Sequence, residues 1–208
     1  MPKPSPPKKQ KPSVVFPDIA PKSQVECQTL LEDQIILLDN IFSPGECKSF
    51  VKFIDSLPLE LTPPKKRGEA ERHNYRHSIT STEFAARLYE MFGPHLPFAA
   101  HSFNSNIRVY KYTESQHFGP HYDDDYRDAI TGAKSQWTLL LYLTGYEDGV
   151  QGGEVVDHFF LFTHLIGLRR CSTRTNKSSK PPSPGELLYC IDMVETVYST
   201  RDHPFCAA

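Results

Sequence analysis

Residues 106–112 read Asn-Ile-Arg-Val-Tyr-Lys-Tyr, with aliphatic side chains at alternate positions. Side chains two apart in an extended chain point to the same face, so this period predicts a strand with one apolar face and one aromatic, polar face. Residues 137–144, Trp-Thr-Leu-Leu-Leu-Tyr-Leu-Thr, predict a second strand, and the glycines of residues 145–153 predict a turn after it. The second half of the chain is therefore expected to be built on a sheet.

The first half of the chain carries helix signals. A short aliphatic run at residues 35–38 predicts a buried strand. Ser43 is expected to cap a helix, because a proline follows it and Glu46 stands three residues later, as in a capping box. A second helix is predicted to start at Ser81 or Thr82, because the apolar residues that follow recur at three- and four-residue spacing. Helices followed by strands predict an α+β fold, with the helices backing an antiparallel sheet or barrel.

Two polar segments are expected to lie outside the core. Seven prolines and several lysines in the first 21 residues predict a disordered tail, which we place at residues 1–24. A loop is predicted at residues 58–72, with a Pro-Pro-Lys-Lys-Arg-Gly tip, and it is expected to be exposed.

The composition limits the classes of partner that we expect this protein to bind. The 208 residues carry 23 basic and 25 acidic side chains, so the chain has no global field that would draw it to nucleic acid or to an anionic membrane. A membrane span needs about 18 or more consecutive apolar residues, and no such run occurs. The N-terminal lysines are not followed by an apolar core, so we expect no secretory signal. We therefore expect no nucleic-acid partner, no membrane association, and a cytoplasmic or nuclear location.

Histidine and aspartate side chains, which can bind metals, are concentrated in residues 116–125, Gln-His-Phe-Gly-Pro-His-Tyr-Asp-Asp-Asp. His121 and Asp123 are two residues apart, so they project from the same face of an extended segment. An imidazole and a carboxylate placed in this way supply two of the three positions of a 2-His-1-carboxylate triad, which binds Fe(II) and leaves coordination positions open. A zinc module using His117, His121 and Asp123 is an alternative, although the Gly-Pro between the two histidines disfavours a helical His-x-x-x-His pair.

The surroundings of this pair resemble a known family. Residues 112–123 follow the pattern Tyr-x-x-x-Gln-x-Phe-x-x-His-x-Asp, and residues 138–143 and then Gly-Gly-Glu at 152–154 come after it. In order and spacing these motifs resemble the catalytic core of prolyl 4-hydroxylase-like Fe(II)/2-oxoglutarate dioxygenases. The Ser-Pro-Gly-Glu-Cys helix start at residues 43–47 is similar as well. We expect this core to span residues 25–156.

The resemblance implies a double-stranded β-helix, or jelly roll, of two facing antiparallel sheets backed by the N-terminal helices. His121 and Asp123 would be iron ligands, Tyr112 would reach a carboxylate of 2-oxoglutarate, and Tyr142 would line the cosubstrate pocket. The reaction would be oxidative decarboxylation of 2-oxoglutarate by O2, coupled to hydroxylation of a protein or small-molecule substrate. Ascorbate would keep the iron reduced. Iron supplies the oxygen chemistry, while the protein fixes geometry and excludes water.

The chain departs from this family after Glu154. The second iron-binding histidine, and the Lys or Arg that pairs with the far carboxylate of 2-oxoglutarate, lack their expected context. We therefore expect residues 157–208 to be aberrant or disordered and the jelly roll to be incomplete. A shifted reading frame of codons 188–202 permits a string resembling the family's late strand, which suggests a retained intron or gene-model error. The chain is then an impaired dioxygenase or, alternatively, a non-catalytic remnant that binds a partner.

Overall fold

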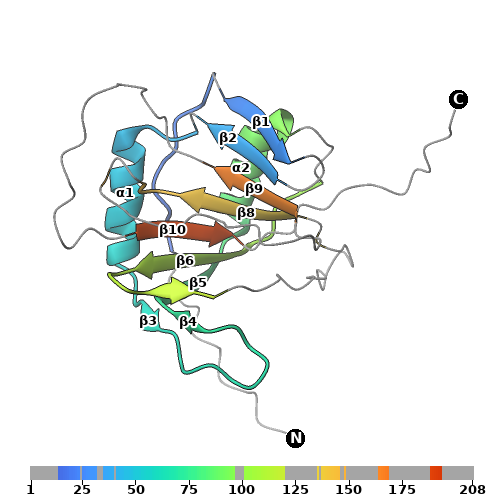
Figure 1. The fold of residues 1–208 in the computed structure, drawn as a ribbon. Helices are drawn as coiled ribbons and strands as arrows, with labels where there is room; N and C mark the ends of the chain where they lie inside the picture. Colours follow the sequence, from blue (N-terminus) through green and yellow to red (C-terminus); the bar gives the residue numbers. More distant parts are fainter. Residues whose placement is uncertain are drawn as a thin grey trace, which may run out of the picture.

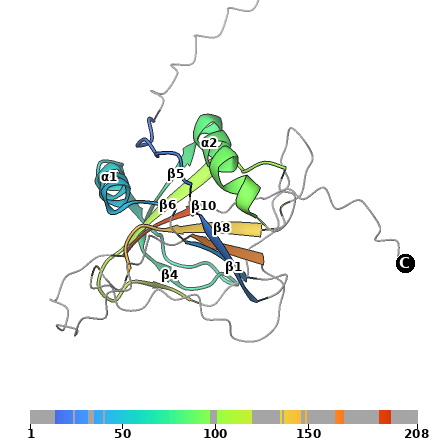
Figure 2. The same cartoon turned by 90° about the horizontal axis from the view of Figure 1, so that it is seen from above.

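Helices and a sheet form separate layers in the computed structural model of this protein (Figure 1). The structure describes residues 14–23, 25–31, 35–39, 41–96, 101–119, 135, 137–145, 148, 164–168 and 188–193. Helices α1 (Pro44–Asp55) and α2 (Thr82–Phe92) lie on one side of the sheet, and the short 3-10 helix η1 (Gly93–His95) continues α2 (Figure 2). The predicted α+β class is confirmed. Among the described residues, neither helix combines the length and apolar character that crossing a bilayer would require.

Ten strands are described, and eight of them form one mixed sheet. In sheet order these are β1 (Glu26–Leu31), β2 (Ile35–Asp39), β9 (His164–Leu168), β8 (Trp137–Tyr142), β10 (Leu188–Met193), β6 (Asn106–Tyr112), β5 (Tyr75–Thr80) and β3 (Glu60–Leu61). Strand β9 runs parallel to β2 and β8, and the other neighbours are antiparallel. A separate two-stranded ladder joins β4 (Arg72–His73) to β7 (His117–Phe118). The two facing sheets of a jelly roll remain a prediction.

The local signals in the sequence placed both helices and three of the strands. The Ser43 hydroxyl accepts a hydrogen bond from the Glu46 N–H at 3.3 Å, and the Glu46 carboxylate accepts one from the Ser43 N–H at 2.7 Å. The capping box of α1 is thus confirmed. The cap of α2 is Ser81, whose hydroxyl accepts from the Phe84 N–H at 3.1 Å. The strands predicted at residues 35–38, 106–112 and 137–144 correspond to β2, β6 and β8.

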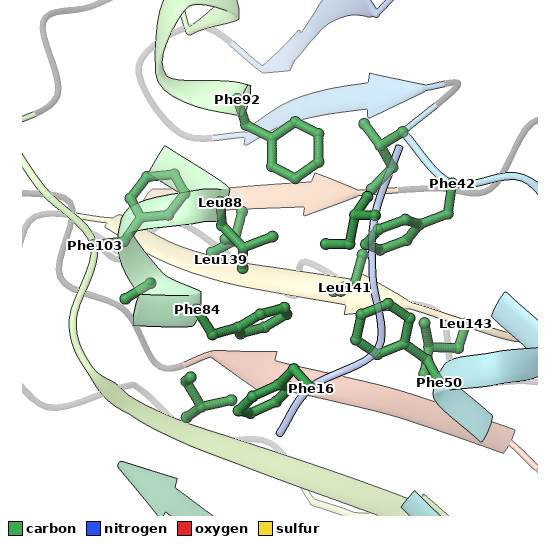
Figure 3. Close-up of a cluster of buried hydrophobic side chains, with 14 of the residues drawn as sticks. Phe16, Phe42, Phe50, Phe84, Leu88, Phe92, Phe103, Leu139, Leu141 and Leu143 are labelled. Carbon is green, nitrogen blue, oxygen red and sulfur yellow. The ribbon is translucent and has the colours of Figure 1, made fainter. Parts of the chain in front are cut away.

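The core fills the space between the helices and one face of the sheet (Figure 3). Alternation along β6 and β8 turns Ile107, Val109, Leu139 and Leu141 toward the helices, and all four are fully buried. The helices contribute a set of buried aromatic and aliphatic side chains, which includes Phe50, Ile54, Phe84, Leu88 and Phe92. The side chains that alternate with these four along β6 and β8 consequently lie on the opposite face of the sheet.

The N-terminal segment differs from the sequence expectation. Within the predicted tail, residues 14–23 pack on the helices: Phe16 stacks on Phe84 with ring centroids 3.9 Å apart, and Ile19 is also buried. Proline and lysine dominate the composition of this region, and composition does not indicate that Phe16 has a packing partner as distant in sequence as Phe84. The prediction of disorder is therefore wrong for residues 14–23, and residues 1–13 lie outside the described residues.

The last quarter of the chain contributes two strands, β9 and β10, which occupy interior positions in the large sheet. The expected disorder of residues 157–208 is wrong for these two strands, and the aberrant origin of the segment stays a prediction. Strand β9 lies between β2 and β8, and β10 lies between β8 and β6. An interior strand satisfies backbone donors and acceptors on both sides, so short apolar runs can take such positions without a recognisable motif. The rest of residues 157–208 lies outside the described residues.

Candidate functional site

The face of the sheet away from the helices carries the tyrosines of the predicted site. Tyr110 and Tyr112 on β6 alternate with the core residues, as does Tyr142 on β8. Strand β10 lies between these strands, and its register places Cys190 opposite both Tyr110 and Tyr142. Residues opposite one another in a ladder share a face. The structure therefore brings Tyr112 and Tyr142, both half-buried, to one face of the sheet.

The ladder of β4 and β7 lies on this same side of the sheet, where Figure 2 shows β4 across from the helices. Its register pairs Arg72 with Phe118 and His73 with His117. The ladder is continued by the Gly119 N–H, which donates to the Glu71 carbonyl at 2.7 Å. Gly119 is the last described residue before the segment that contains His121 and Asp123. These two predicted metal ligands lie outside the described residues.

A tight turn at residues 113–116 leads β6 into β7. The Gln116 N–H donates to the Thr113 carbonyl at 3.0 Å, and the Gln116 side-chain oxygen accepts from the Thr113 N–H at 2.8 Å. Ser115 adopts a positive φ of 64°. Gln116, which the sequence singled out only as part of a motif, thus has a local role, because it closes the turn that sets the direction of β7.

Arg72 links this ladder to the sheet. Its guanidinium carbon lies 3.5 Å from the centre of the Phe118 ring and 4.9 Å from the centre of the Tyr110 ring. The rings of Tyr110 and Tyr112 meet edge to face, with centroids 6.5 Å apart. Sequence reasoning missed Arg72, because it stands at the end of a polar loop and no local pattern distinguishes it from the other basic residues there.

The backbone around Arg72 is held by Thr62. The Thr62 hydroxyl donates to the Arg72 carbonyl at 2.9 Å and accepts from the Asn74 N–H at 3.2 Å. The Thr62 N–H donates to the Asn74 carbonyl at 2.9 Å. Asn74 is completely buried, whereas residues 63–69 of the loop between them are exposed, as predicted. The two ends of the loop are therefore fixed to each other and position β4.

The described side chains of this site suit an anionic ligand better than a metal ion. Phenol hydroxyls and a guanidinium group donate hydrogen bonds to carboxylates. Among the described residues there is no group of three or more His, Cys, Asp or Glu side chains that could hold a metal. Of the three residues in the zinc alternative, only His117 is described, and it is exposed.

No protein-family model, curated protein or solved structure matched this chain. The family resemblance consequently rests on the motifs in residues 43–47, 112–123 and 138–154 alone. Of the site residues that it implies, Tyr112 and Tyr142 are placed on one face of the sheet, and the described chain stops two residues before His121.

Proposed function

We propose that this protein is an Fe(II)/2-oxoglutarate dioxygenase of the prolyl 4-hydroxylase-like type, impaired in the form of this chain. Fe(II) would be bound by His121 and Asp123, and 2-oxoglutarate would lie beside Tyr112 and Tyr142. One observation carries the proposal: the two tyrosines, which are 30 residues apart in the sequence, share the face of the sheet over which β7 runs toward His121. The large sheet would be one of the two sheets of a jelly roll.

The chemistry of the face fits this cosubstrate. 2-Oxoglutarate carries two carboxylates, and the hydroxyl of Tyr112 can donate a hydrogen bond to one of them. Tyr142 and the buried Tyr110 would form an aromatic wall that limits access of water. Bound iron would supply the activation of O2. The overall reaction converts 2-oxoglutarate, O2 and a C–H bond of the second substrate into succinate, CO2 and an alcohol.

The proposed impairment follows from the ligand set. His121 and Asp123 are two protein ligands, whereas the triad has three. A site that lacks the third ligand in its family context should hold Fe(II) weakly and turn over slowly. The substrate to be hydroxylated would be a protein or a small molecule. Ascorbate would be required to return oxidised iron to Fe(II).

The test measures iron binding and succinate formation together. Purified full-length protein is titrated with Fe(II) under argon, then supplied with 2-oxoglutarate, ascorbate and O2. We expect weak Fe(II) binding and slow iron-dependent formation of succinate, both abolished by His121→Ala and by Asp123→Ala. His117→Ala is the matched control and should change neither quantity.

Three results would contradict the proposal. Fe(II) binding that survives both His121→Ala and Asp123→Ala would show that these two residues are not the iron ligands. A protein that instead binds zinc stoichiometrically and loses it in His117→Ala would favour the zinc module. Iron binding without succinate formation would favour the non-catalytic remnant, which keeps the metal site and lacks the activity.

A further inference from the structure

We infer that Arg72 is the cation that receives the carboxylate of 2-oxoglutarate remote from its keto group, an inference that rests on the proposed function. The late-strand Lys or Arg expected for this task has no recognisable place in the sequence. Arg72 comes from a different part of the chain, the short strand β4, and the structure brings it to the face that carries Tyr112 and Tyr142.

The positive charge of Arg72 has no counter-charge among the described residues. The side chain is half-buried, and its Nε is buried without a hydrogen-bond partner. Among the residues that the structure describes, no carboxylate forms an ion pair with it. A partly buried positive charge without a counter-charge costs free energy, which stacking on Phe118 and Tyr110 offsets only in part. An anionic ligand would supply the missing compensation.

Arg72 also lies at the face of the sheet that carries the tyrosines. The guanidinium group lies over the ring of Tyr110, whose neighbour along the same face is Tyr112. Guanidinium groups bind carboxylates through two parallel N–H bonds, so a carboxylate at Arg72 would lie at the tyrosine-lined face and below β7. The Thr62 hydroxyl and the β4–β7 ladder fix the backbone of Arg72, which makes the cation a preorganised feature of the site.

The experiment compares two keto acids that differ only at the far end. 2-Oxopentanoate has the keto-acid group and chain length of 2-oxoglutarate, but it carries a methyl group where the second carboxylate would be. Binding of each acid to the full-length chain is measured by calorimetry, with Fe(II) under argon and again without metal. The quantity of interest is the ratio of the two affinities, because general damage to the fold lowers both affinities and leaves the ratio unchanged.

We expect the unmodified protein to prefer 2-oxoglutarate and Arg72→Gln to reduce that preference at least about tenfold. Arg72→Lys keeps the charge and should retain part of the preference. The matched control is Lys48→Gln, which removes an exposed cation from α1, on the helical side of the sheet, and should leave the ratio unchanged. Far-ultraviolet circular dichroism verifies that each variant is folded.

Several outcomes overturn the inference. These are equal binding of the two acids by the unmodified protein, binding of neither acid, an unchanged ratio in Arg72→Gln, or a ratio that falls in Lys48→Gln instead. The proposed function is judged separately by iron-dependent succinate formation. Succinate formation with a ratio insensitive to Arg72 would refute the inference alone. An Arg72-dependent ratio without iron binding at His121 and Asp123 would refute the function alone.

Discussion

Lys22 Nζ lies 2.6 Å from the Glu46 carboxylate, so the N-terminal segment is fastened to the first turn of α1 by an ion pair that is largely shielded from solvent. The same carboxylate accepts hydrogen bonds from the Ala20 N–H at 2.7 Å, and from the N–H and hydroxyl of Ser43 at 2.7 and 2.8 Å. One side chain therefore closes the capping box and holds residues 14–23 against the helices.

Replacing Glu46 should destabilise the protein in a pH-dependent way. Burial tends to raise the pKa of Glu46, but hydrogen bonds from Lys22, Ser43 and Ala20 outweigh it and hold the pKa below its usual value. A carboxyl group with a lowered pKa stabilises the fold above its unfolded pKa, and this contribution is lost as the pH falls through the folded pKa. We expect Glu46→Gln to cost about 1–3 kcal/mol at neutral pH. The cost should shrink in acid.

Urea unfolding at several pH values measures this difference. The matched control is Glu83→Gln in the first turn of α2, where the carboxylate is 87% exposed and lies 3.5 Å from Arg87. An exposed pair of this kind contributes at most about 1 kcal/mol. Equal losses for Glu46→Gln and Glu83→Gln would contradict the role given to Glu46.

Phe16→Ala tests whether residues 14–23 belong to the folded core. Phe16 is 5% exposed and stacks on Phe84, and it also contacts Phe53 with ring centroids 5.0 Å apart. Removing a buried phenylalanine costs about 3–5 kcal/mol in well-packed cores. We expect a loss near the lower end of that range, and faster proteolysis within residues 14–23.

Val15→Ala is the control for this prediction, because Val15 is 79% exposed and should contribute less than about 0.5 kcal/mol. If Phe16→Ala and Val15→Ala unfold at the same urea concentration, residues 14–23 behave as the tail that their composition suggests.

The features that the sequence predicted and those that it missed differ in how far apart the interacting residues are. Ser43 and Glu46 are three residues apart, as are Ser81 and Phe84, so a local pattern is enough to find both caps. The alternation along β6 likewise fixes which face Tyr112 occupies. By contrast, the positions of β9 and β10 depend on strands elsewhere in the chain, as does the stacking of Phe16. Nothing in a local window specifies such pairings.

The same distinction holds within the candidate site. Tyr112 and Tyr142 could be chosen from a motif, and the period of two along residues 106–112 predicts that Tyr112 faces away from the core. Arg72 reaches the site only because Thr62 braces its backbone and because β7 pairs with β4. These are contacts between separate segments, which spacing alone does not reveal.

Ser115→Gly should stabilise the turn between β6 and β7. Ser115 has a φ of 64°, and it is the only non-glycine residue with a positive φ in the described part of the chain. A side chain in this left-handed region costs about 1–2 kcal/mol, from which the greater chain entropy of glycine in the unfolded state must be subtracted. We expect a net gain of about 0.5–1 kcal/mol in the free energy of unfolding.

Glu114→Gly, one position earlier in the same turn, is the control for this prediction. Its φ is not positive, so it gains nothing from glycine and should lose about 0.5 kcal/mol to chain entropy. Opposite signs for the two variants support the strain at Ser115, and equal signs contradict it.

Gly119→Ala probes whether the β4–β7 ladder positions the metal-binding segment. A Cβ at Gly119 would lie 3.3 Å from the Glu71 carbonyl oxygen, which also accepts the Gly119 N–H. The two strands would have to separate slightly, at a cost of about 1 kcal/mol. Because His121 and Asp123 follow within four residues, we expect Fe(II) affinity to fall more than global stability does.

Gly45→Ala in α1 is the control, since its Cβ would approach only the Ser43 hydroxyl, at 4.0 Å. Unchanged iron binding in Gly119→Ala would mean that the ladder does not set the geometry of the ligands.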